Sequence, residues 1–186
     1  MKAKALFAIA MFIGAGLAKA QDLGTPTSKT PFDAYLGPMR SVLSSLGSNH
    51  PDEPVVAEYV KVGRGFRYYM KDPLVPQTPQ ETESTRAGDC KAKSLWVAYK
   101  MDDRTLRFIV GRAHASSGMN HAWLLWKSPS GWLILDPTLL STPIDVNRVG
   151  PNEYTPRYSY SASGKFIHPG AISAKPKGVV RYGDHA

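Results

Sequence analysis

Helical periodicity comes first in this chain, and strand-like alternation comes later. Apolar residues recur at helical spacing over 32–46, 54–62 and 90–101. Strand-like segments, which alternate or are rich in β-branched and aromatic residues, follow over 106–110, 120–127, 132–136, 154–160 and 165–168. Helices followed by strands favour an α+β fold with an antiparallel sheet over alternating βαβ units.

Prolines and turn residues divide these segments. Pro38 lies inside the first helical pattern and should kink or split that helix, because an internal proline removes a backbone hydrogen bond. Residues 66–70 are typical of an extended segment, and the proline-rich stretch 71–87 is expected to be a loop. Ser128–Gly131 predicts a turn that joins two strands into a hairpin.

The first 20 residues have the pattern of a secretory signal peptide. Lys2 and Lys4 precede an uncharged stretch over 5–18, and Ala18-Lys19-Ala20 offers small residues around a cleavage point. An uncleaved anchor is less favoured, because a membrane span needs about 20 apolar residues. We therefore expect a periplasmic or secreted protein that does not span a membrane after cleavage.

The remaining chain is expected to form one domain. Residues 21–30 predict a flexible leader, 31–180 a single domain, and 181–186 a loose tail. This length is sufficient for one hydrophobic core. Loss of the three lysines of the signal peptide lowers the formal net charge from +8 to +5.

Cys90 is the single cysteine of the chain, so an intramolecular disulfide is excluded. A lone cysteine in an exported protein is either a reactive thiol or a small buried apolar residue. Cys90 follows Gly88 and Asp89 at the predicted start of the helix over 90–101. Unpaired N–H groups and the helix dipole favour a thiolate there, and the same N–H groups can stabilise an oxyanion. Asp89 is expected to cap this helix.

His121 and Asp136 complete a possible set of nucleophile, base and orienting acid with Cys90. If the hairpin has an even loop, Trp126 faces Leu133, and His121 and Asp136 become diagonal neighbours on one face of the sheet. An odd loop would place them on opposite faces. The turn residues permit either loop, so the sequence leaves the register open.

Other residues compete for these roles. His114, between a strand and a loop, is the rival base, whereas His50, His168 and His185 are expected at the surface. Asp145 is a weaker substitute for Asp136. Gln77 and Gln80 precede the nucleophile at a distance compatible with an oxyanion donor, but neither is assigned. The tryptophans of the strands either line a cleft or fill the core: Trp123, Trp126 and Trp132.

The blocks Gly88-Asp89-Cys90, His121-Ala122-Trp123 and Gly131 to Thr138 occur in an order that resembles the transglutaminase-like core. Over about 66–140, the chain is most similar to the bacterial transglutaminase-like cysteine peptidases. The resemblance implies a papain-like arrangement, with the cysteine helix packed on an antiparallel sheet. It also implies a catalytic triad in which Cys90 is the nucleophile, His121 the base and Asp136 the orienting acid.

The resemblance implies an exported thiol protease, a hydrolase of peptide or isopeptide-type amides that acts through an acyl-enzyme. The same triad also serves protein-glutamine acyl transfer, and the sequence does not choose between them. Another papain-like hydrolase, such as a cell-wall endopeptidase, is a more remote alternative. We expect no cofactor. Calcium, which some relatives bind, is disfavoured here because Lys91-Ala92-Lys93 replaces their usual acidic residues.

The expected partner is a protein or peptide substrate, anionic or associated with the cell envelope. Basic residues interleave with aromatic ones in the C-terminal part, which favours an anionic partner. The same region would serve a catalytically silent envelope-binding domain, which is the alternative from another functional class. No nucleic-acid motif accompanies these charges, and no ligand spacing predicts a metal site.

Overall fold

The computed structural model describes residues 23–113, 120–150 and 152–169. The predicted signal peptide, the rival base His114, the terminal His185 and the predicted tail over 181–186 lie outside these residues. The proposed limits of the domain, 31–180, remain predictions. No helix in the described part of the chain is long and apolar enough to cross a membrane.

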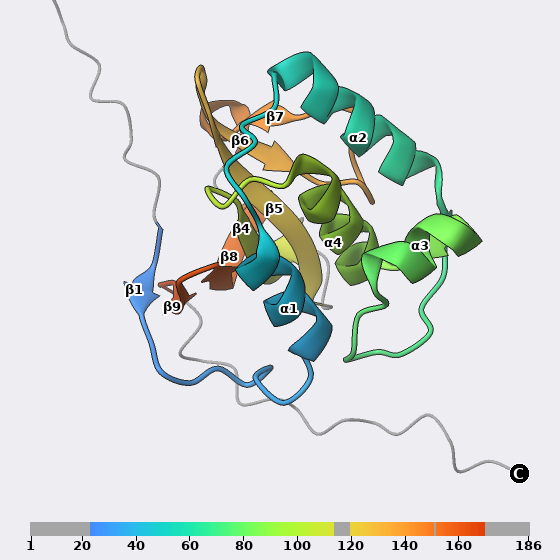
Figure 1. The fold of residues 1–186 in the computed structure, drawn as a ribbon. Coiled ribbons are helices and arrows are strands. Elements are labelled where there is room, and N and C mark those ends of the chain that lie inside the picture. The colour runs from blue at the N-terminus through green and yellow to red at the C-terminus, as the bar shows by residue number, and fades with distance from the viewer. Residues whose placement is uncertain (1–22, 114–119, 151, 170–186) are drawn as a thin grey trace, which may run out of the picture.

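One sheet forms the centre of the described structure (Figure 1). Its seven strands are all antiparallel to their neighbours and follow the order β1-β9-β8-β4-β5-β6-β7. The strands are β1 (Thr25–Pro26), β4 (Arg107–Ala113), β5 (His121–Ser128), β6 (Gly131–Leu135), β7 (Ile144–Asp145), β8 (Tyr154–Ser161) and β9 (Gly164–Ile167). Helices precede most of these strands in the chain, so the predicted α+β class is confirmed.

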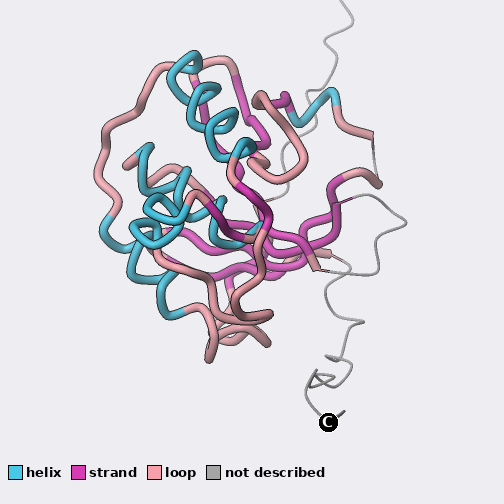
Figure 2. Tube along the Cα trace, turned by 90° about the vertical axis from the view of Figure 1, so that its right-hand side faces the viewer, coloured by secondary structure: helices cyan, strands magenta, loops and turns pink. Residues whose placement is uncertain are grey.

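The described residues form four α-helices, which gather on one side of the sheet (Figures 1 and 2). They are α1 (Gly37–Ser45), α2 (Glu53–Gly65), α3 (Pro79–Thr85) and α4 (Cys90–Met101). Short β2 (Arg67–Tyr68) and β3 (Ala87–Gly88) pair in parallel beside them, and the 3-10 helix η1 (Val146–Arg148) follows β7. Pro38 splits the first predicted helix, because α1 begins only at Gly37 and thus keeps the proline in its first turn.

The expected loop over 71–87 contains α3, so that prediction is wrong. Thr78 caps this helix by accepting a hydrogen bond from the Glu81 N–H over 3.2 Å, and Pro79 occupies the first helical position. Proline tolerates that position because its missing N–H would be unpaired there anyway. These starting signals were present in the sequence, but the helix is too short to show a clear periodicity.

Part of the leader predicted over 21–30 contacts the sheet in the described structure, and its flexibility remains a prediction. Thr25 and Pro26 form β1, which pairs with Ile167 and Phe166 of β9. Thr30 Oγ1 then lies 2.7 Å from the hydroxyl oxygen of Tyr160. The leader is held by strand pairing to a part of the chain about 140 residues away, which no local pattern predicts.

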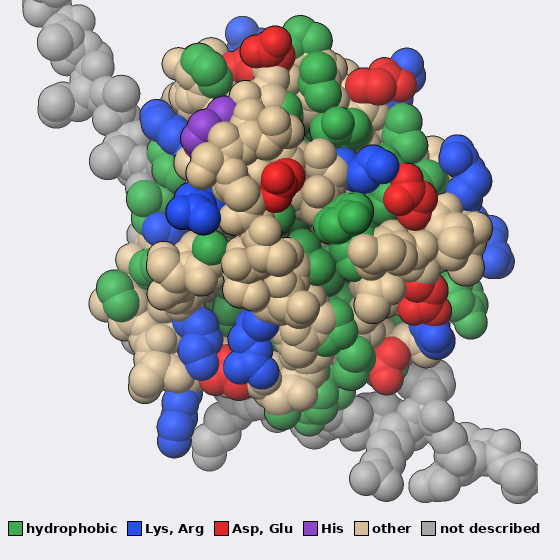
Figure 3. Space-filling view, viewed as in Figure 1, with side chains coloured by type: hydrophobic (Ala, Val, Ile, Leu, Met, Phe, Trp, Pro, Cys, Tyr) green, Lys and Arg blue, Asp and Glu red, His purple; other side chains and the backbone are tan. Residues whose placement is uncertain are grey.

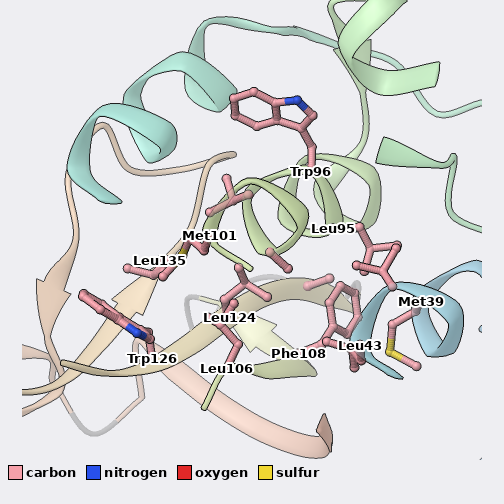
Figure 4. Close-up of a cluster of buried hydrophobic side chains, with 14 of the residues drawn as sticks. Met39, Leu43, Leu95, Trp96, Met101, Leu106, Phe108, Leu124, Trp126 and Leu135 are labelled. Atoms are coloured by element: carbon pink, nitrogen blue, oxygen red, sulfur yellow. The ribbon is translucent and has the colours of Figure 1, made fainter. Parts of the chain in front are cut away.

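Helix α4 is the buried centre of the helical layer. It has the predicted bounds, and its residues pack against the sheet through Leu95 and Met101, which meet Phe108, Leu124 and Leu135 (Figure 4). Trp96 points to the other side, where its ring contacts Phe66 and Tyr59 edge to face. A helix that is covered on both sides is apolar around most of its circumference. This burial fixes the position of its N-terminus, where Cys90 stands.

Candidate active site

Cys90 is the first residue of α4 and is almost buried. Asp89 caps the helix as expected: its Oδ1 accepts the N–H groups of Lys91 and Ala92 over 3.0 and 3.1 Å. Any side chain at position 88 would clash, because a Cβ there would lie 2.8 Å from the Cβ of Ala92. The chain therefore enters the helix along a close approach that glycine permits.

The β5–β6 hairpin has the even register. Trp126 pairs with Leu133 and Ser128 with Gly131, so the loop contains two residues. His121 at the start of β5 and Asp136 directly after β6 consequently fall on the same face of the sheet. The even register is the one that the sequence analysis required for contact between His121 and Asp136.

His121 and Asp136 are in direct contact. His121 Nε2 lies 2.7 Å from Asp136 Oδ2, and the carboxylate is fully buried. The hydroxyl of Tyr154 donates to the same oxygen over 2.9 Å. The backbone N–H groups of Thr138 and Leu139 donate to Oδ1 over 3.0 and 3.1 Å. Four donors thus hold the buried carboxylate in one orientation, as a buried charge requires.

The surroundings of His121 favour its protonated form. Burial alone lowers the pKa of this ring, but the hydrogen bond and charge of Asp136 and the interaction with Cys90 raise it, to about 10. Because Nε2 faces Asp136, the other ring nitrogen remains for the sulfur. An imidazolium beside a cysteine favours the thiolate, which is the nucleophilic form.

Aromatic packing supports the histidine from behind. The Trp123 ring stacks on the His121 ring with 6.1 Å between centroids, and Tyr154 meets Trp123 edge to face at 5.2 Å. Gly111 pairs with His121 across the sheet. A Cβ at Gly111 would lie 2.3 Å from the Thr155 carbonyl oxygen and 2.8 Å from the Trp123 ring. Because Gly111 on β4 has no side chain, the Trp123 ring of β5 and the Thr155 backbone of β8 can pack closely against it beside His121.

Two lysines beside the cysteine are held inside the structure. The Lys91 ammonium forms an ion pair with the Asp89 carboxylate and donates to the Asp72 carbonyl over 3.3 Å. Lys93 is 1% exposed and donates to the Phe66 carbonyl over 2.6 Å. Burial and the charge of Arg64 lower the pKa of Lys93, and Asp136 opposes this shift. Both lysines thus stabilise the fold around the helix start.

Cys90 and His121 open into a cavity of about 370 Å³. Its walls come from the segment before α1, the segment after β2, the end of β4 and the residues after Asp136. The cavity lies next to the helix start, where a substrate carbonyl would have to approach the sulfur. The arrangement therefore combines a thiol, an imidazole with a raised pKa and a cavity in front of them.

The structure separates several other candidates from this site. Asp145 lies on β7 and caps η1 by accepting the Asn147 N–H over 2.8 Å. His50 is exposed, as expected, and contacts Asp103. The surface position predicted for His168 is wrong, because this residue is buried and its Nε2 lies 2.9 Å from Ser159 Oγ. Its burial follows from the pairing of β8 with β9, which the lone His-Pro pattern does not reveal.

The remaining candidates pack rather than line the cavity. Trp123 and Trp126 are fully buried, and Trp132 packs against a second cluster of apolar residues, so these rings fill the core. Gln77 is buried near Gly88, Gln80 is exposed on α3, and neither contributes to the cavity wall. Tyr154 is the residue that sequence analysis missed. Its aromatic spacing on β8 indicated a strand, and no sequence signal linked its hydroxyl to Asp136.

Comparisons with known proteins identify the fold. No family model and no curated protein sequence matches this chain. Solved structures that match include three of LapG from Legionella pneumophila, among them a calcium-bound and an EGTA-treated form. Their TM-scores are 0.50, 0.51 and 0.50, with sequence identities of 21%, 22% and 22%.

These matches extend over most of both chains. They cover 68%, 68% and 72% of this chain and 74%, 74% and 75% of LapG. LapG has a transglutaminase-like fold, so the fold expected from the sequence is confirmed. At this level of identity the likeness concerns the fold.

One neighbour is calcium-bound, and the family resemblance in the sequence directs attention to the residues beside Cys90 as a possible calcium site. Calcium takes six to eight oxygen ligands, among them several carboxylates. Here the Asp89 carboxylate is engaged by the Lys91 ammonium, and the Asp136 carboxylate is saturated by four donors. In residues 23–113, 120–150 and 152–169, no group of three or more His, Cys, Asp or Glu residues could hold a metal ion. The described residues around Cys90 therefore do not fit calcium.

Proposed function

We propose that this protein is a cysteine hydrolase that cleaves peptide or isopeptide-type amide bonds. In this proposal Cys90 is the nucleophile, His121 the general base and acid, and Asp136 the residue that orients His121. Tyr154 positions Asp136. The observation that carries the proposal is the 2.7 Å contact between His121 and the buried Asp136, with Cys90 interacting with the same ring.

The fold supports a reaction of this class. LapG, one of the structural neighbours, is a bacterial transglutaminase-like cysteine protease. The positions that match the cysteine, histidine and acid blocks of such enzymes in this sequence are also those that lie together in space. The sequence blocks and the hairpin register thus support the pairing of His121 with Asp136 independently.

The chemistry proceeds in two steps. The Cys90 thiolate attacks the carbonyl carbon, a C–S bond forms, and the carbonyl oxygen becomes an oxyanion. The His121 imidazolium then protonates the amine, the C–N bond breaks and an acyl-enzyme remains. In the second step neutral His121 takes a proton from water, and the resulting hydroxide attacks the thioester. Breakdown of that intermediate releases the carboxylic acid and restores the thiolate.

The oxyanion needs a donor at the start of α4. Asp89 already accepts the N–H groups of Lys91 and Ala92, and its backbone carbonyl accepts that of Lys93. Within the described first turn, this leaves the Cys90 N–H for the oxyanion. One preorganised backbone donor of this kind contributes roughly a hundredfold or more to the rate.

Acyl transfer to an amine uses the same triad and remains the alternative outcome of the second step. A silent envelope-binding domain is supported less well. The aromatic residues that were expected to interleave with basic ones at the surface include Tyr158 and Tyr160, which are buried. A surface that combines cations with aromatic rings is therefore not formed by these two residues.

Export to the periplasm or secretion is part of the proposal. It rests on the signal-like pattern of the first 20 residues, and LapG is a periplasmic protease. The substrate would then be a protein or peptide of that compartment or of the cell envelope. A fusion of residues 1–30 to a periplasmic reporter would test export, and retention of the reporter in the cytoplasm would contradict it.

Thiol alkylation tests the activated cysteine directly. Iodoacetamide should modify Cys90 rapidly at neutral pH, and His121→Ala should slow this reaction at least tenfold because the imidazolium is lost. A peptide library then tests hydrolysis, which Cys90→Ser should abolish. Equal alkylation rates in the wild type and His121→Ala would contradict the proposed pair.

A further inference from the structure

The cavity in front of Cys90 and His121 has an apolar wall. Phe32 and Leu36 come from the segment that leads into α1, and Met70 and Leu74 from the segment after β2. Leu139, three residues after Asp136, also lines the cavity. In Figure 3 hydrophobic side chains reach the surface in a band between α1 and α3, in the region of the N-terminus of α4. Apolar residues from three distant parts of the chain thus surround the nucleophile.

The charges at this cavity are already compensated. Lys91, which contributes to the wall, is paired with Asp89 and the Asp72 carbonyl. The His121 ring is paired with Asp136. A charged substrate side chain that entered here would lose its water without gaining a free counter-charge from these two residues, and that loss is unfavourable.

Several of the wall residues are exposed, although they are large and apolar. Tyr68 is 52% exposed, Met70 48% and Leu139 40%. Apolar side chains that are exposed singly over a surface are ordinary, whereas several exposed around one cavity mark a binding surface. The volume of about 370 Å³ lies at the lower end of the range for ligand sites, which suits one or two side chains.

We propose that this cavity accepts a peptide segment with a large aliphatic or aromatic side chain beside the scissile bond. Met70 and Leu139 are the specificity-determining residues that contact this side chain from two separate loops. The proposal rests on the proposed function, because the cavity is defined by its opening at Cys90. It adds a substrate class, an extended apolar peptide segment, to the reaction.

Two neutral alkylating reagents test the cavity without a substrate. Iodoacetamide and N-benzyl iodoacetamide differ by one aromatic ring, and each rate is divided by the rate with free N-acetylcysteine. Wild-type Cys90 should favour the benzyl reagent by about tenfold, because the ring leaves water for an apolar wall. Met70→Glu and Leu139→Glu should each reduce this preference to below threefold.

Val55→Glu is the matched control. Val55 is 43% exposed on α2 and is not part of the cavity wall, so this substitution should leave the preference unchanged. Since all three replaced side chains are exposed, the variants should keep the wild-type Tm. No benzyl preference in the wild type, or a preference that both Met70→Glu and Leu139→Glu leave intact, would overturn the proposal.

Peptides separate this proposal from the proposed function. Matched peptides carry Leu, Phe, Glu or Lys beside a central amide, and preferred cleavage of the Leu and Phe peptides supports both proposals. Equal cleavage of all four would refute the apolar site and leave the hydrolase intact. A benzyl preference without cleavage of any peptide would support the apolar site and count against the hydrolase.

Discussion

Tyr154→Phe removes one of the four donors that hold the buried carboxylate beside His121. The lost O–H bond to Asp136 Oδ2 is 2.9 Å long, and that oxygen also lies 2.7 Å from His121 Nε2. A hydrogen bond to a charged group contributes about 1.5–3 kcal/mol. Because Tyr154 is partly exposed and water can replace the phenol, we expect the free energy of unfolding to fall by about 1.5 kcal/mol.

The same change should affect catalysis through the orientation of His121. Asp136 Oδ1 keeps its two backbone donors, but Oδ2 loses the phenol that limits its rotation. We expect kcat for a cleaved peptide to fall roughly tenfold with little change in KM, because small errors in the position of the base slow the reaction. Urea unfolding gives the stability, and steady-state kinetics with Cys90 alkylation give the effect on the site.

Tyr160→Phe is the matched control. Its hydroxyl lies 2.7 Å from Thr30 Oγ1, away from the site, so its loss should cost about 1 kcal/mol of stability and leave kcat unchanged. If Tyr154→Phe also leaves kcat and the alkylation rate unchanged, Tyr154 only packs beside the site and the positioning argument is wrong.

Three further predictions concern the proton of His121, the packing behind it and calcium. Burial alone lowers the pKa of His121, but Asp136 and Cys90 raise it from 6.5 to about 10. Protonation of this ring therefore stabilises the folded state fully below pH 6.5. The contribution disappears as the pH rises to 10. The stability advantage of the wild type over His121→Gln, measured by urea unfolding, should therefore shrink between pH 6.5 and 10, and a constant difference would contradict the raised pKa. Gly111→Ala places a Cβ 2.3 Å from the Thr155 carbonyl oxygen and should destabilise the protein by about 3 kcal/mol or more, whereas Gly37→Ala, with open space around its Cβ, should change stability by less than about 1 kcal/mol. Thermal unfolding of both variants checks this pair, and equal Tm values would refute the packing argument. Millimolar calcium or EGTA should leave the Tm of the wild type unchanged, because Lys91 already neutralises Asp89; a clear shift in differential scanning fluorimetry would reveal a calcium site.

Much of the site follows from local sequence patterns. The helix over Cys90–Met101 has the predicted bounds, because its apolar spacing and the Asp89 cap both mark the same start. The turn residues between Ser128 and Gly131 predicted a hairpin with either an even or an odd loop, and the even loop forms. Once the even loop forms, the period of two along a strand brings His121 and Asp136 to one face.

Local patterns failed where a residue depends on a distant segment. Helix α3 is shorter than the window in which periodicity is visible, and β1 exists because β9 offers a free edge. The His-Pro pattern predicts a surface position for His168, but the pairing of β8 and β9 buries this residue. Propensity describes what a segment can form alone, and tertiary contacts decide whether it does.

Local sequence patterns predicted the helix over Cys90–Met101, the order of helices and strands, and two possible registers for His121 and Asp136. Sheet pairing and core packing then set which register forms, brought the Tyr154 hydroxyl of β8 to Asp136, and placed Phe32, Met70 and Leu139 in one cavity wall. The difference lies in the distance along the chain over which each interaction acts. Caps, periods and turns act within a few residues, whereas a buried carboxylate and an apolar cavity are completed by side chains that sheet order and core packing bring from far along the chain.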